Sequence, residues 1–469
     1  MELKSLQPEQ KALEINLDSK IYGTFAEIGA GQEVARIFFQ VGAAAGTIAK
    51  TMSAYDKTYS DAIYGIEESG RYVCESRLNK MLDHEYNLME ERLHSERPET
   101  KFFVFADTVA AINYSKTIKG QGWLGVRFQL DSKSPPNDLI VHVKMLDNNT
   151  ILQQESIGKL GANMIYGAYF YHQNPEKLVK SMMDGLDDRI HIDMIKLTGP
   201  DFTELDQRLL SLYLVNNELT DVAMFDSKGK MCHAGEFFYK KHLMVVRGHY
   251  RPPTNVTMDV FKCAFEQFKK DPNVDEDKAR LVTELTLENL IFNGKLDEKD
   301  FQMRGKMLNS LDKTVMISSC NNHQHLINYL SDFKIQSLGL VIGARELTHI
   351  INEKYILNQD GRLLVAFGEL FNRNITIYVY PAYDDDGQFR TSENLQVPEG
   401  IKFLYRHLLD CNQIVPIEGY NKEQLKIMPA GVMRDLLNGE ENWSSWVPKP
   451  VAETIVENNF FGLHPEAVN

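Results

Sequence analysis

The 469-residue sequence is poor in cysteine and has no long uninterrupted apolar segment. Its five cysteines are scattered, and no two have the C-x-x-C spacing of zinc fingers or thioredoxin-like sites. An odd number of scattered thiols fits a reducing compartment, so we expect a cytoplasmic protein. The N-terminal segment is polar and lacks the apolar stretch of a signal peptide. Charged residues interrupt the apolar runs before the ~18 residues of a membrane-spanning helix, so we expect no membrane partner.

Positive charge is also scarce. The chain has 51 Lys and Arg against 65 Asp and Glu, which gives a net charge of −14. An acidic surface repels phosphate backbones, so nucleic acid is not expected as a partner. The hydrophobic content of 43% is ordinary for a folded protein, and the length is sufficient for two or three domains.

Strand-like and helix-like segments alternate along the chain. Residues 101–109, KFFVFADTV, form an apolar run typical of a buried strand, and Asp107 lies near its end, where open α/β sheets collect ligands. Residues 150–170 have the apolar spacing of a long helix. The alternation predicts an α/β fold with a mainly parallel sheet and flanking helices, followed by a helix-rich C-terminal part.

Composition also suggests the domain organisation. Stretches rich in Pro, Asn and Asp over residues 251–278 indicate a boundary, because such residues favour turns and linkers. We therefore expect an N-terminal arm over 1–20, an α/β domain over 21–255 and a helix-rich α/β second domain over 256–469. Small residues in the GAAAG step at 42–46 would allow close packing, either in the core or between subunits, and we expect a homo-oligomer.

Residues 22–39, YGTFAEIGAGQEVARIFF, predict a strand, a tight glycine turn and a helix that continues to about Met52. Gly29 and Gly31 permit unusual backbone dihedrals, and the first-turn amides of a helix favour an anion. The spacing matches neither G-x-G-x-x-G nor G-x-x-x-x-G-K-[ST]. Two interpretations follow: a phosphate site with Gln32 as a further contact, or a turn that packs a helix on a sheet.

Two short stretches resemble motifs of nicotinate- and nicotinamide-mononucleotide adenylyltransferases. The first motif, GGTFDPxHxGH, is in register with Gly23, Thr24, Phe25, Ile28 and Gly31. The second, ISSTxxR, is similar to ISSCNNH at 317–323. The whole chain resembles a bacterial family whose members often carry the automatic name nicotinate-nucleotide adenylyltransferase. The resemblance implies a nucleotide ligand, Mg²⁺ if transfer chemistry is retained, and nucleotide contacts from Gly29, Gly31, Gln32, Ser318, Ser319 and His323.

This chain departs from both motifs at the positions that carry charge. Gly29 and Gln32 stand where the family has the two histidines that bind the triphosphate. His323 stands in place of the arginine, and an imidazole is mostly uncharged near pH 7. The catalytic residues are therefore unknown, and whether the protein is an enzyme is left open. Any transfer chemistry would need Mg²⁺ to supply the missing charge.

The segment VVRGHYR is the densest basic cluster of this acidic chain. The two-residue period of a strand would place Arg247, His249 and Arg251 on one face. Arg247 and Arg251 could then be auxiliary ligands of a phosphate or carboxylate. The alternative is a solvated strand edge that pairs with nearby acidic residues.

Two weaker constellations complete the candidates. His191 and Asp193 share a strand face and could begin a metal site, although no metal is expected. Cys320 precedes a predicted helix near His323, a position that can lower the pKa of a thiol and make it a nucleophile. The alternative, which we favour, is a half-buried core cysteine followed by Asn321 or Asn322 as the helix cap.

The leading hypothesis is a cytoplasmic protein that binds a nucleotide or phosphate and resembles nucleotidyltransferases without their catalytic histidines. The alternative is a non-catalytic self-assembling or scaffold protein, because the chain has small-residue helix faces and no complete catalytic set. Whether residues 22–39 and 317–323 share one site is the geometric question that the sequence raises.

Overall fold

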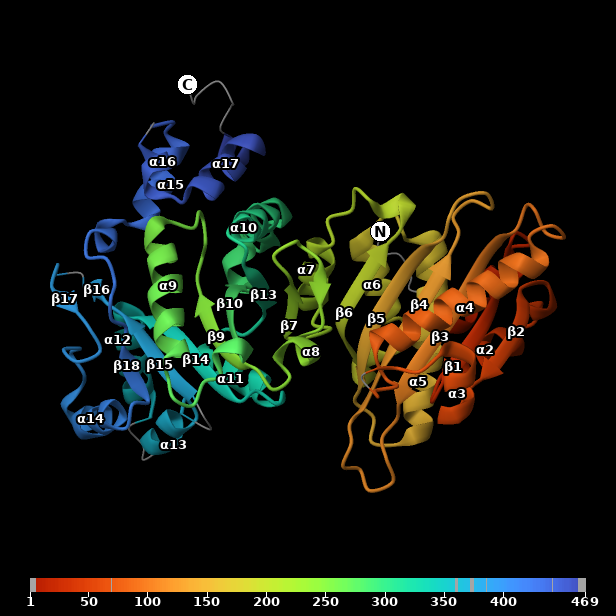
Figure 1. Cartoon of the computed structure of the whole chain (residues 1–469), viewed down its shortest axis with the longest axis horizontal. Coiled ribbons are helices and arrows are strands. Elements are labelled where there is room, and N and C mark those ends of the chain that lie inside the picture. The colour runs from red at the N-terminus through yellow and green to blue at the C-terminus, as the bar shows by residue number, and fades with distance from the viewer. Residues whose placement is uncertain are drawn as a thin grey trace. The chain divides into compact units, whose positions relative to one another are not determined.

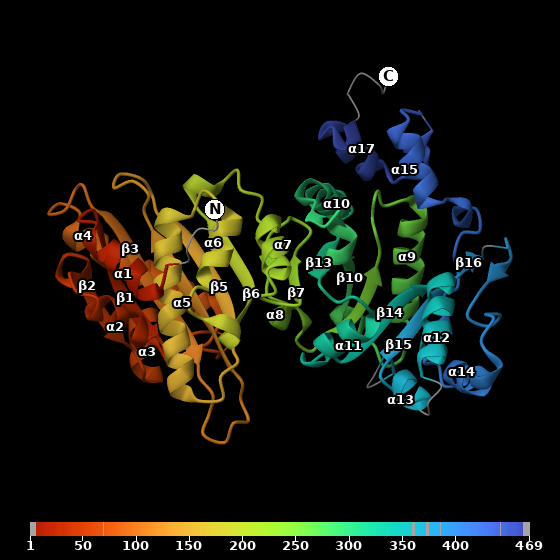
Figure 2. The ribbon, with the colours of Figure 1, turned by 180° about the vertical axis from the view of Figure 1, so that it is seen from behind.

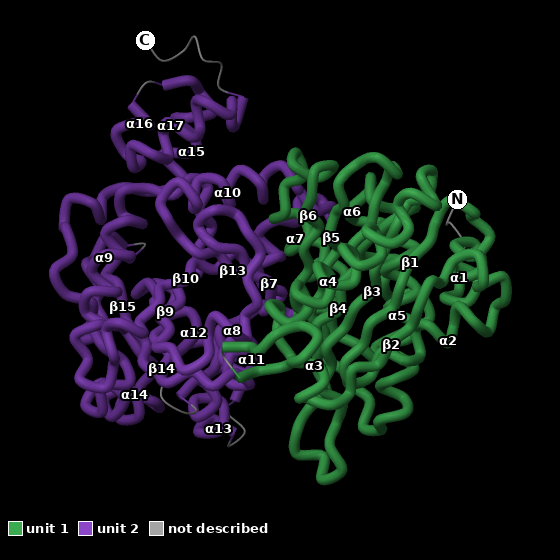
Figure 3. Tube along the Cα trace, turned by 45° about the vertical axis from the view of Figure 1, so that its right-hand side comes forward, with its two compact units in different colours: residues 1–220 green, residues 221–469 purple. Residues whose placement is uncertain are grey.

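A computed structural model of the chain describes residues 6–68, 70–358, 362–371, 375–384, 386–440 and 442–462. The chain divides into two compact units, residues 1–220 and 221–469, which are coloured separately in Figure 3. Each unit has its own β-sheet with helices packed against it (Figure 1 and Figure 2). Within the described part of the chain, no helix combines the length and the hydropathy that crossing a membrane requires.

The first unit contains a six-stranded mixed sheet in the order β2-β1-β3-β4-β5-β6. Its strands are β1 Ile21–Ile28, β2 Ile48–Ser53, β3 Lys101–Ala110, β4 Gly120–Phe128, β5 Asn137–Met145 and β6 Ile190–Thr198. β1 runs parallel to both of its neighbours, β2 and β3, and the remaining pairs are antiparallel. Because β1 is central to the parallel part, its carboxyl end is the place where this sheet can position a ligand.

Helices cover both faces of the first sheet. They are α1 Pro8–Leu17, α2 Gln32–Gln40, α3 Lys57–Tyr64, α4 Glu75–Leu93, α5 Thr150–Phe170, α6 Pro175–Met182 and α7 Arg208–Asn216. Glycine lets α5 approach closely, because a Cβ on Gly161 would lie 2.5 Å from Val34 of α2 and 3.0 Å from Phe105 of β3. On the other face, a Cβ on Gly125 of β4 would lie 2.9 Å from Leu82 of α4. The small residues of α5 thus serve the core of the first unit.

The second unit contains an eight-stranded sheet in the order β18-β15-β14-β9-β10-β13-β7-β8. Its strands are β7 Val222–Phe225, β8 Met231–Cys232, β9 His242–Arg247, β10 Ala279–Thr286, β13 Thr314–Ser318, β14 Ser337–Gly343, β15 Ile375–Tyr380 and β18 Ile414–Pro416. The six strands from β18 to β13 pair in parallel, whereas β7 and β8 join antiparallel at the β13 edge. Counted from β9, the parallel order is 6-5-4-1-2-3, which is the strand order of a Rossmann fold.

Helices and two small hairpins complete the second unit. The helices are α8 Ala234–Phe238, α9 Asn255–Lys269, α10 Glu298–Ser310, α11 His323–Ser331, α12 Ala344–Leu357, α13 Leu363–Gly368, α14 Lys402–Asp410, α15 Pro429–Leu437, α16 Trp443–Trp446 and α17 Lys449–Glu457. The hairpins are β11 Ile291–Phe292 with β12 Lys295–Leu296, and β16 Ala382–Tyr383 with β17 Phe389–Arg390. α9 packs on β14, where its Phe268 approaches Gly339. α11 contributes Leu326, Ile327 and Leu330 to the core that contains Leu243 and Val245 of β9.

The predicted fold class is confirmed. Within the two main sheets, seven strand pairs among the described residues are parallel and five are antiparallel. Helices flank both sheets and dominate the C-terminal part (Figure 1). Parallel pairing is concentrated in the second sheet, because the five crossovers between its parallel strands each contain a described helix of at least eight residues: α9, α10, α11, α12 and α14.

The domain boundary lies elsewhere than the sequence suggested. The expected boundary at 255/256 falls between β9 and α9, yet β9 pairs in register with both β10 and β14. The proline-rich stretch is therefore the first strand-to-helix loop of the second unit, and the boundary along the chain falls between residues 220 and 221. At the N-terminus, residues 1–5 of the expected arm lie outside the described residues. α1 buries Ala12, Ile15 and Lys11, whose Nζ lies 2.6 Å from Asp184, so it belongs to the first core.

Candidate functional site

The switch point of the second sheet lies between β9 and β14. The chain builds β10 and β13 on one side of β9 and then crosses back to place β14 on its other side. At such a point the two loops beyond the strand ends diverge and leave a crevice, which is where open α/β sheets bind ligands. The residues of this crevice come from the β9–α9 loop, from α9, from the ends of β14 and β15, and from α15.

The β9–α9 loop has a fixed shape. Tyr250 has a positive φ of 49° and is buried, and its hydroxyl donates a 2.6 Å hydrogen bond to the carbonyl of Val246. A Cβ on Gly248 would lie 2.9 Å from the Tyr250 ring, so the close approach of that ring requires glycine. Thr254 then caps α9, because its side chain accepts from the Thr257 amide and the Thr257 hydroxyl accepts from the Thr254 amide. The loop thus leads directly to a well-defined helix N-terminus.

The crevice has a volume of about 560 Å³, which is within the typical range of small-molecule pockets. Its walls are mainly apolar, with Val246, Val256, Val260, Val341 and Met433 among the lining residues. Its polar lining includes Arg247, His249, Arg251 and Thr257. An apolar cleft with a few polar groups on one side can hold a ligand that has a flat apolar part and an anionic part.

Arg247 is held by a buried carboxylate. Its Nε and one terminal nitrogen donate to Glu284 at 2.9 and 2.8 Å, and the same terminal nitrogen donates to the Cys320 carbonyl at 3.1 Å. Glu284 is fully buried and also accepts a 2.6 Å hydrogen bond from the Ser318 hydroxyl. This network joins β9, β10 and β13 and fixes the guanidinium plane at the wall of the crevice.

Arg251 is more accessible than Arg247. Its side chain is 46% exposed, and its Nε lies 2.8 Å from Asp300 of α10. Asp300 also pairs with Arg304, which donates to the carbonyls of His249 and Asn289. Burial, together with the charge of Arg304, lowers the pKa of His249, so this imidazole is neutral at pH 7. Arg251 is therefore the cation of this loop that a ligand in the crevice can reach with least desolvation.

The second predicted motif lies at the end of β13. Ser318 donates to Glu284, while the Ser319 amide donates to the Asp221 carbonyl at 2.9 Å. Burial and the charge of Arg247 lower the pKa of His323 to about 3, so it carries no positive charge at neutral pH. The structure brings Ser318 and Arg247 to one network around Glu284, but Ser318, Ser319 and His323 are not among the residues that line the crevice.

Cys320 does not have the environment of a nucleophile. Its side chain is buried, and burial together with the charges of Glu284 and Asp221 raises the pKa of the thiol to about 12. The alternative interpretation of the sequence, a core cysteine followed by an asparagine cap, is confirmed: Asn322 caps α11 by accepting from the His325 amide, and desolvation of Cys320 outweighs any effect of this helix N-terminus on the pKa.

The first predicted motif lies in the other unit. Gly29 has a φ of +108°, and a Cβ there would lie 2.0 Å from the Val109 carbonyl oxygen. A Cβ on Gly31 would lie 1.6 Å from Oδ2 of Asp107, a residue of β3. Gln32 donates to the Gly29 carbonyl at 3.2 Å. Both glycines are therefore explained by the close packing of this turn on β3, and the two motifs belong to different compact units.

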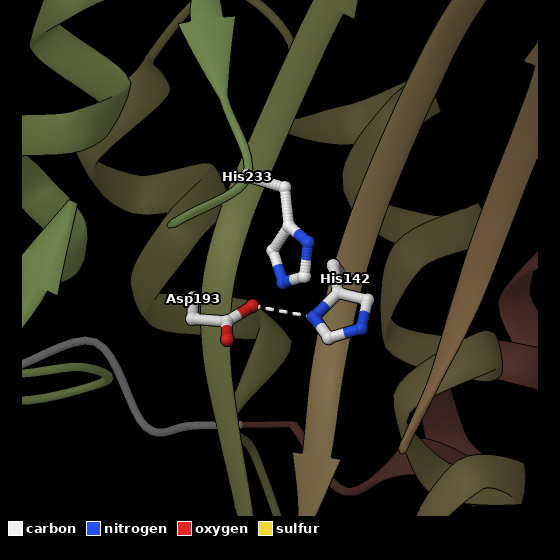
Figure 4. Close-up of side chains that lie close together, drawn as sticks. All are labelled: His142, Asp193 and His233. Carbon is white, nitrogen blue, oxygen red and sulfur yellow. Dashed lines mark hydrogen bonds and ion pairs between the residues drawn. The ribbon is translucent and has the colours of Figure 1, made fainter. Parts of the chain in front are cut away.

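The weaker metal constellation is also rearranged. Asp193 of β6 accepts from Nδ1 of His142 of β5 at 2.6 Å, and both side chains are buried (Figure 4). The β5–β6 register shifts between His142 and Val143, so Asp193 lies at a bulge that directs its carboxylate toward this imidazole. Lys144 lies 3.3 Å from the same carboxylate, and Gln121 contacts the other ring nitrogen at 3.1 Å. The partner of Asp193 is thus His142, whereas the sequence had suggested His191.

Neither a family model nor a curated protein matches the chain. Among solved structures, it is similar to the competence/damage inducible protein CihA from Agrobacterium tumefaciens, with 14% identity and a TM-score of 0.26 over 35% of this chain and 97% of that chain. A CinA superfamily protein from Enterobacter cloacae has 11% identity and a TM-score of 0.27 over 36% and 95%. The competence damage-inducible protein A from Klebsiella pneumoniae has 10% identity and a TM-score of 0.26 over 36% and 99%. These similarities are too weak to carry an argument about function.

Proposed function

We propose that the second unit binds a nucleotide, or another small molecule with an apolar ring and a phosphate, in the crevice between β9 and β14. The observation that carries this proposal is the position of a ~560 Å³ crevice at the switch point of a sheet with Rossmann strand order. A strand order by itself is only an analogy, and the lining side chains supply the chemistry.

The two kinds of wall fit the two parts of such a ligand. Val256, Val260 and Met433 offer an apolar surface for a base or another flat ring. Arg251 lies at the entrance of α9, where first-turn amides and the positive end of the helix favour a phosphate. Arg247 is already paired with Glu284, so its contribution is mainly to shape the wall. The ligand specificity therefore rests on Arg251, the α9 N-terminus and the valine-rich wall.

Adenylyl transfer is not part of this proposal. The sequence suggested that the turn with Gly29, Gly31 and Gln32 binds phosphate. The carboxyl group of Asp107 lies against Gly31, so an anion in this turn would have to approach a group that carries negative charge when ionised. Transfer would also need positive charge, and the imidazole of His323 is neutral. The proposed function is binding, with Mg²⁺ as the counter-ion of a polyphosphate ligand if one is bound.

Thermal shift and isothermal titration calorimetry with ATP, NAD, nicotinate mononucleotide and inorganic phosphate, with and without Mg²⁺, test the proposal. A ligand at a hundredfold excess over its Kd should stabilise the second unit by about 2.7 kcal/mol. Arg251→Ala should weaken binding by ~3- to 10-fold, because it removes a partly exposed charge-assisted contact. Arg406→Ala is the matched control, since Arg406 is also exposed and ion-paired, 3.0 Å from Asp410.

A second variant tests the location of the site without changing charge. Gly343 lines the crevice, and no atom of the described residues lies within 4 Å of the position of its Cβ. Gly343→Leu should fill part of the crevice and abolish binding, while Gly368→Leu, also in open space, should leave binding unchanged. No stabilisation by any ligand of the panel, or equal binding by the Gly343 and Gly368 variants, would contradict the proposal.

A further inference from the structure

The carboxyl ends of β1 and β3 bring two acidic side chains together in the first unit. Glu27 and Asp107 are register partners on these adjacent parallel strands. Register partners in a parallel pair point to the same face of the sheet, so the two carboxyl groups are neighbours. Both side chains are buried: Asp107 is 0% exposed and Glu27 is 6% exposed. The pair lies beside the Gly29–Gly31 turn and the start of α2, at the sheet edge where the parallel strands of this unit end.

Asp107 lacks the donors that a buried carboxylate requires. Neither of its oxygens has a hydrogen-bond partner among the described residues. The Ile28 amide lies nearby and lowers the pKa of Asp107 slightly against the large effect of burial, but it does not meet hydrogen-bond geometry. Burying a carboxylate without donors is costly, so such groups in folded proteins are protonated, paired or bound to a cation.

Two further buried oxygens lack partners, one on Glu27 and one on Gln32, whose side chain bonds to Ser53, the register partner of Glu27 on β2. They are Oε2 of Glu27 and Oε1 of Gln32. The orientation of the Gln32 amide is defined, because its nitrogen donates to the Gly29 carbonyl and to the Ser53 hydroxyl, each at 3.2 Å. The oxygen of this amide is therefore the atom left over. Among the described residues, the charge of Glu33 raises the pKa of Glu27, and the charge of Glu27 raises the pKa of Asp107. No described lysine or arginine is among the causes of either pKa shift, so the pair has no neutralising cation.

We propose that Glu27, Asp107 and the amide oxygen of Gln32 form a binding site for a hard divalent cation of the Mg²⁺ and Mn²⁺ class in the first unit. All of its groups are oxygen acceptors, which are the ligands that these ions take. Two carboxylates balance the two positive charges, and the ion supplies the partner that the buried oxygens otherwise lack. The glycine turn is then explained as well, because Gly31 leaves room for the Asp107 carboxylate against the backbone.

This site is independent of the nucleotide crevice. Its residues belong to the first unit, and the crevice belongs to the second. A phosphate at the Gly29–Gly31 turn would face two carboxyl groups, whereas a cation would be attracted by them. The same turn that the sequence suggested as an anion site is therefore assigned to an ion of opposite sign.

Mn²⁺ binding to the full chain, measured from the electron paramagnetic resonance signal of free Mn²⁺ at pH 8, tests the proposal. The expected result is one site per chain that Mg²⁺ displaces. Asp107→Asn and Glu27→Gln should each weaken Mn²⁺ binding ~10-fold or more, because the charge of the donor set sets the affinity. Glu85→Gln is the matched control, since Glu85 is equally buried but pairs with Lys50 and Tyr64.

Gly31→Ala tests the geometry with every charge retained. Its added methyl group would overlap Asp107 Oδ2, so the carboxylate must move and binding should fall as in the Asp107 variant. Gly46→Ala adds a methyl group in open space and should bind like the wild type. If Asp107→Asn fails to fold, Mn²⁺ binding by the Glu27→Gln and Gly31→Ala variants decides whether the site exists.

Three results would overturn the cation site. They are no Mn²⁺ binding by the wild-type chain, binding that none of the three site variants reduces, and an equal loss in the Glu85 control. If the wild-type chain binds no Mn²⁺, because protons and not a cation occupy the two carboxyl groups, the nucleotide proposal is unaffected. Loss of nucleotide binding in the Arg251 variant alone would likewise leave the cation proposal untouched.

Discussion

Replacing Glu27 by glutamine should flatten the pH dependence of the stability of the first unit. Burial is the main cause that raises the pKa of Glu27 from 4.5 to about 7, and the charge of Glu33 adds to it. The folded state therefore retains a proton that the unfolded chain loses between pH 4.5 and 7. Stability from this group is complete below pH 4.5, falls as the pH rises to about 7 and stays constant above it.

The size of this fall follows from the two pKa values. At about 1.4 kcal/mol per pKa unit, the difference between 4.5 and about 7 corresponds to about 3 kcal/mol. The Ser53 hydroxyl favours the ionised form of Glu27, and the pKa is about 7 despite this hydrogen bond. Glutamine keeps the shape of the side chain and has no proton to lose, so the variant should lack this fall. The expected difference between wild type and variant between pH 5 and 8 is therefore about 2–3 kcal/mol.

Urea denaturation with EDTA present, followed by hydrogen exchange of peptides from β1 and β3, measures this effect in the first unit alone. EDTA removes divalent ions that would otherwise stabilise the ionised form. Glu85→Gln serves as the control, because Glu85 is paired with Lys50 and should leave the pH profile of Glu27 in place. A difference between wild type and Glu27→Gln that is the same at pH 5 and pH 8 would refute the reasoning.

Three further experiments test the packing of the first unit and the environment of Ser318 and Cys320 in the second unit. Gly161→Val should destabilise the first unit by ~2–3 kcal/mol in urea, because its side chain would overlap Val34 and Phe105, while Gly46→Val in open space should change stability by less than ~0.5 kcal/mol. Ser318→Ala should cost about 1–3 kcal/mol in the second unit, measured in the same way, since it removes the 2.6 Å hydrogen bond to the buried Glu284 carboxylate and leaves that oxygen with Arg247 as its donor. Cys320 should resist a thiol reagent at pH 8 until the unit unfolds, whereas the exposed Cys411 should react at once; prompt labelling of Cys320 would contradict its high pKa.

Local chain signals were sufficient for the start of the first strand–turn–helix. β1 ends at Ile28, the turn follows, and α2 begins at Gln32, as the glycine pattern predicted. The predicted continuation to Met52 is wrong, because Gly42 and Ala43 both have positive φ and end the helix region after Gln40. The apolar residues beyond belong to β2, whose side chains alternate between half-buried and exposed as in an edge strand. A helical spacing of a few apolar residues could not distinguish these two outcomes.

The basic cluster was found from the sequence, but its partners were not. Arg247 and Arg251 do line one crevice, although the strand ends at Arg247 and the loop, not a strand face, positions Arg251. Glu284 and Asp300, which neutralise these arginines, are distant in the sequence and reach them only through the pairing of β9 with β10 and the packing of α10. A charge count along the chain therefore overestimates how much positive charge a ligand meets.

The same limit applies to the glycine turn, for which the sequence left a phosphate site and a packing turn as alternatives. A strand, a small-residue turn and a helix N-terminus favour an anion when they are considered alone. What changes the preference here is Asp107, which comes from a different strand and lies against Gly31. The sequence shows Asp107 at the end of an apolar strand, but only the parallel pairing of β1 with β3 makes it the neighbour of Glu27. Two adjacent carboxyl groups outweigh the partial positive charge of one short helix, because a helix terminus carries about half an elementary charge. If both carboxyl groups are ionised, or if they share one proton, the pair is negative and attracts a cation; only when both are protonated does the pair carry no charge. In none of these states does the pair attract a phosphate.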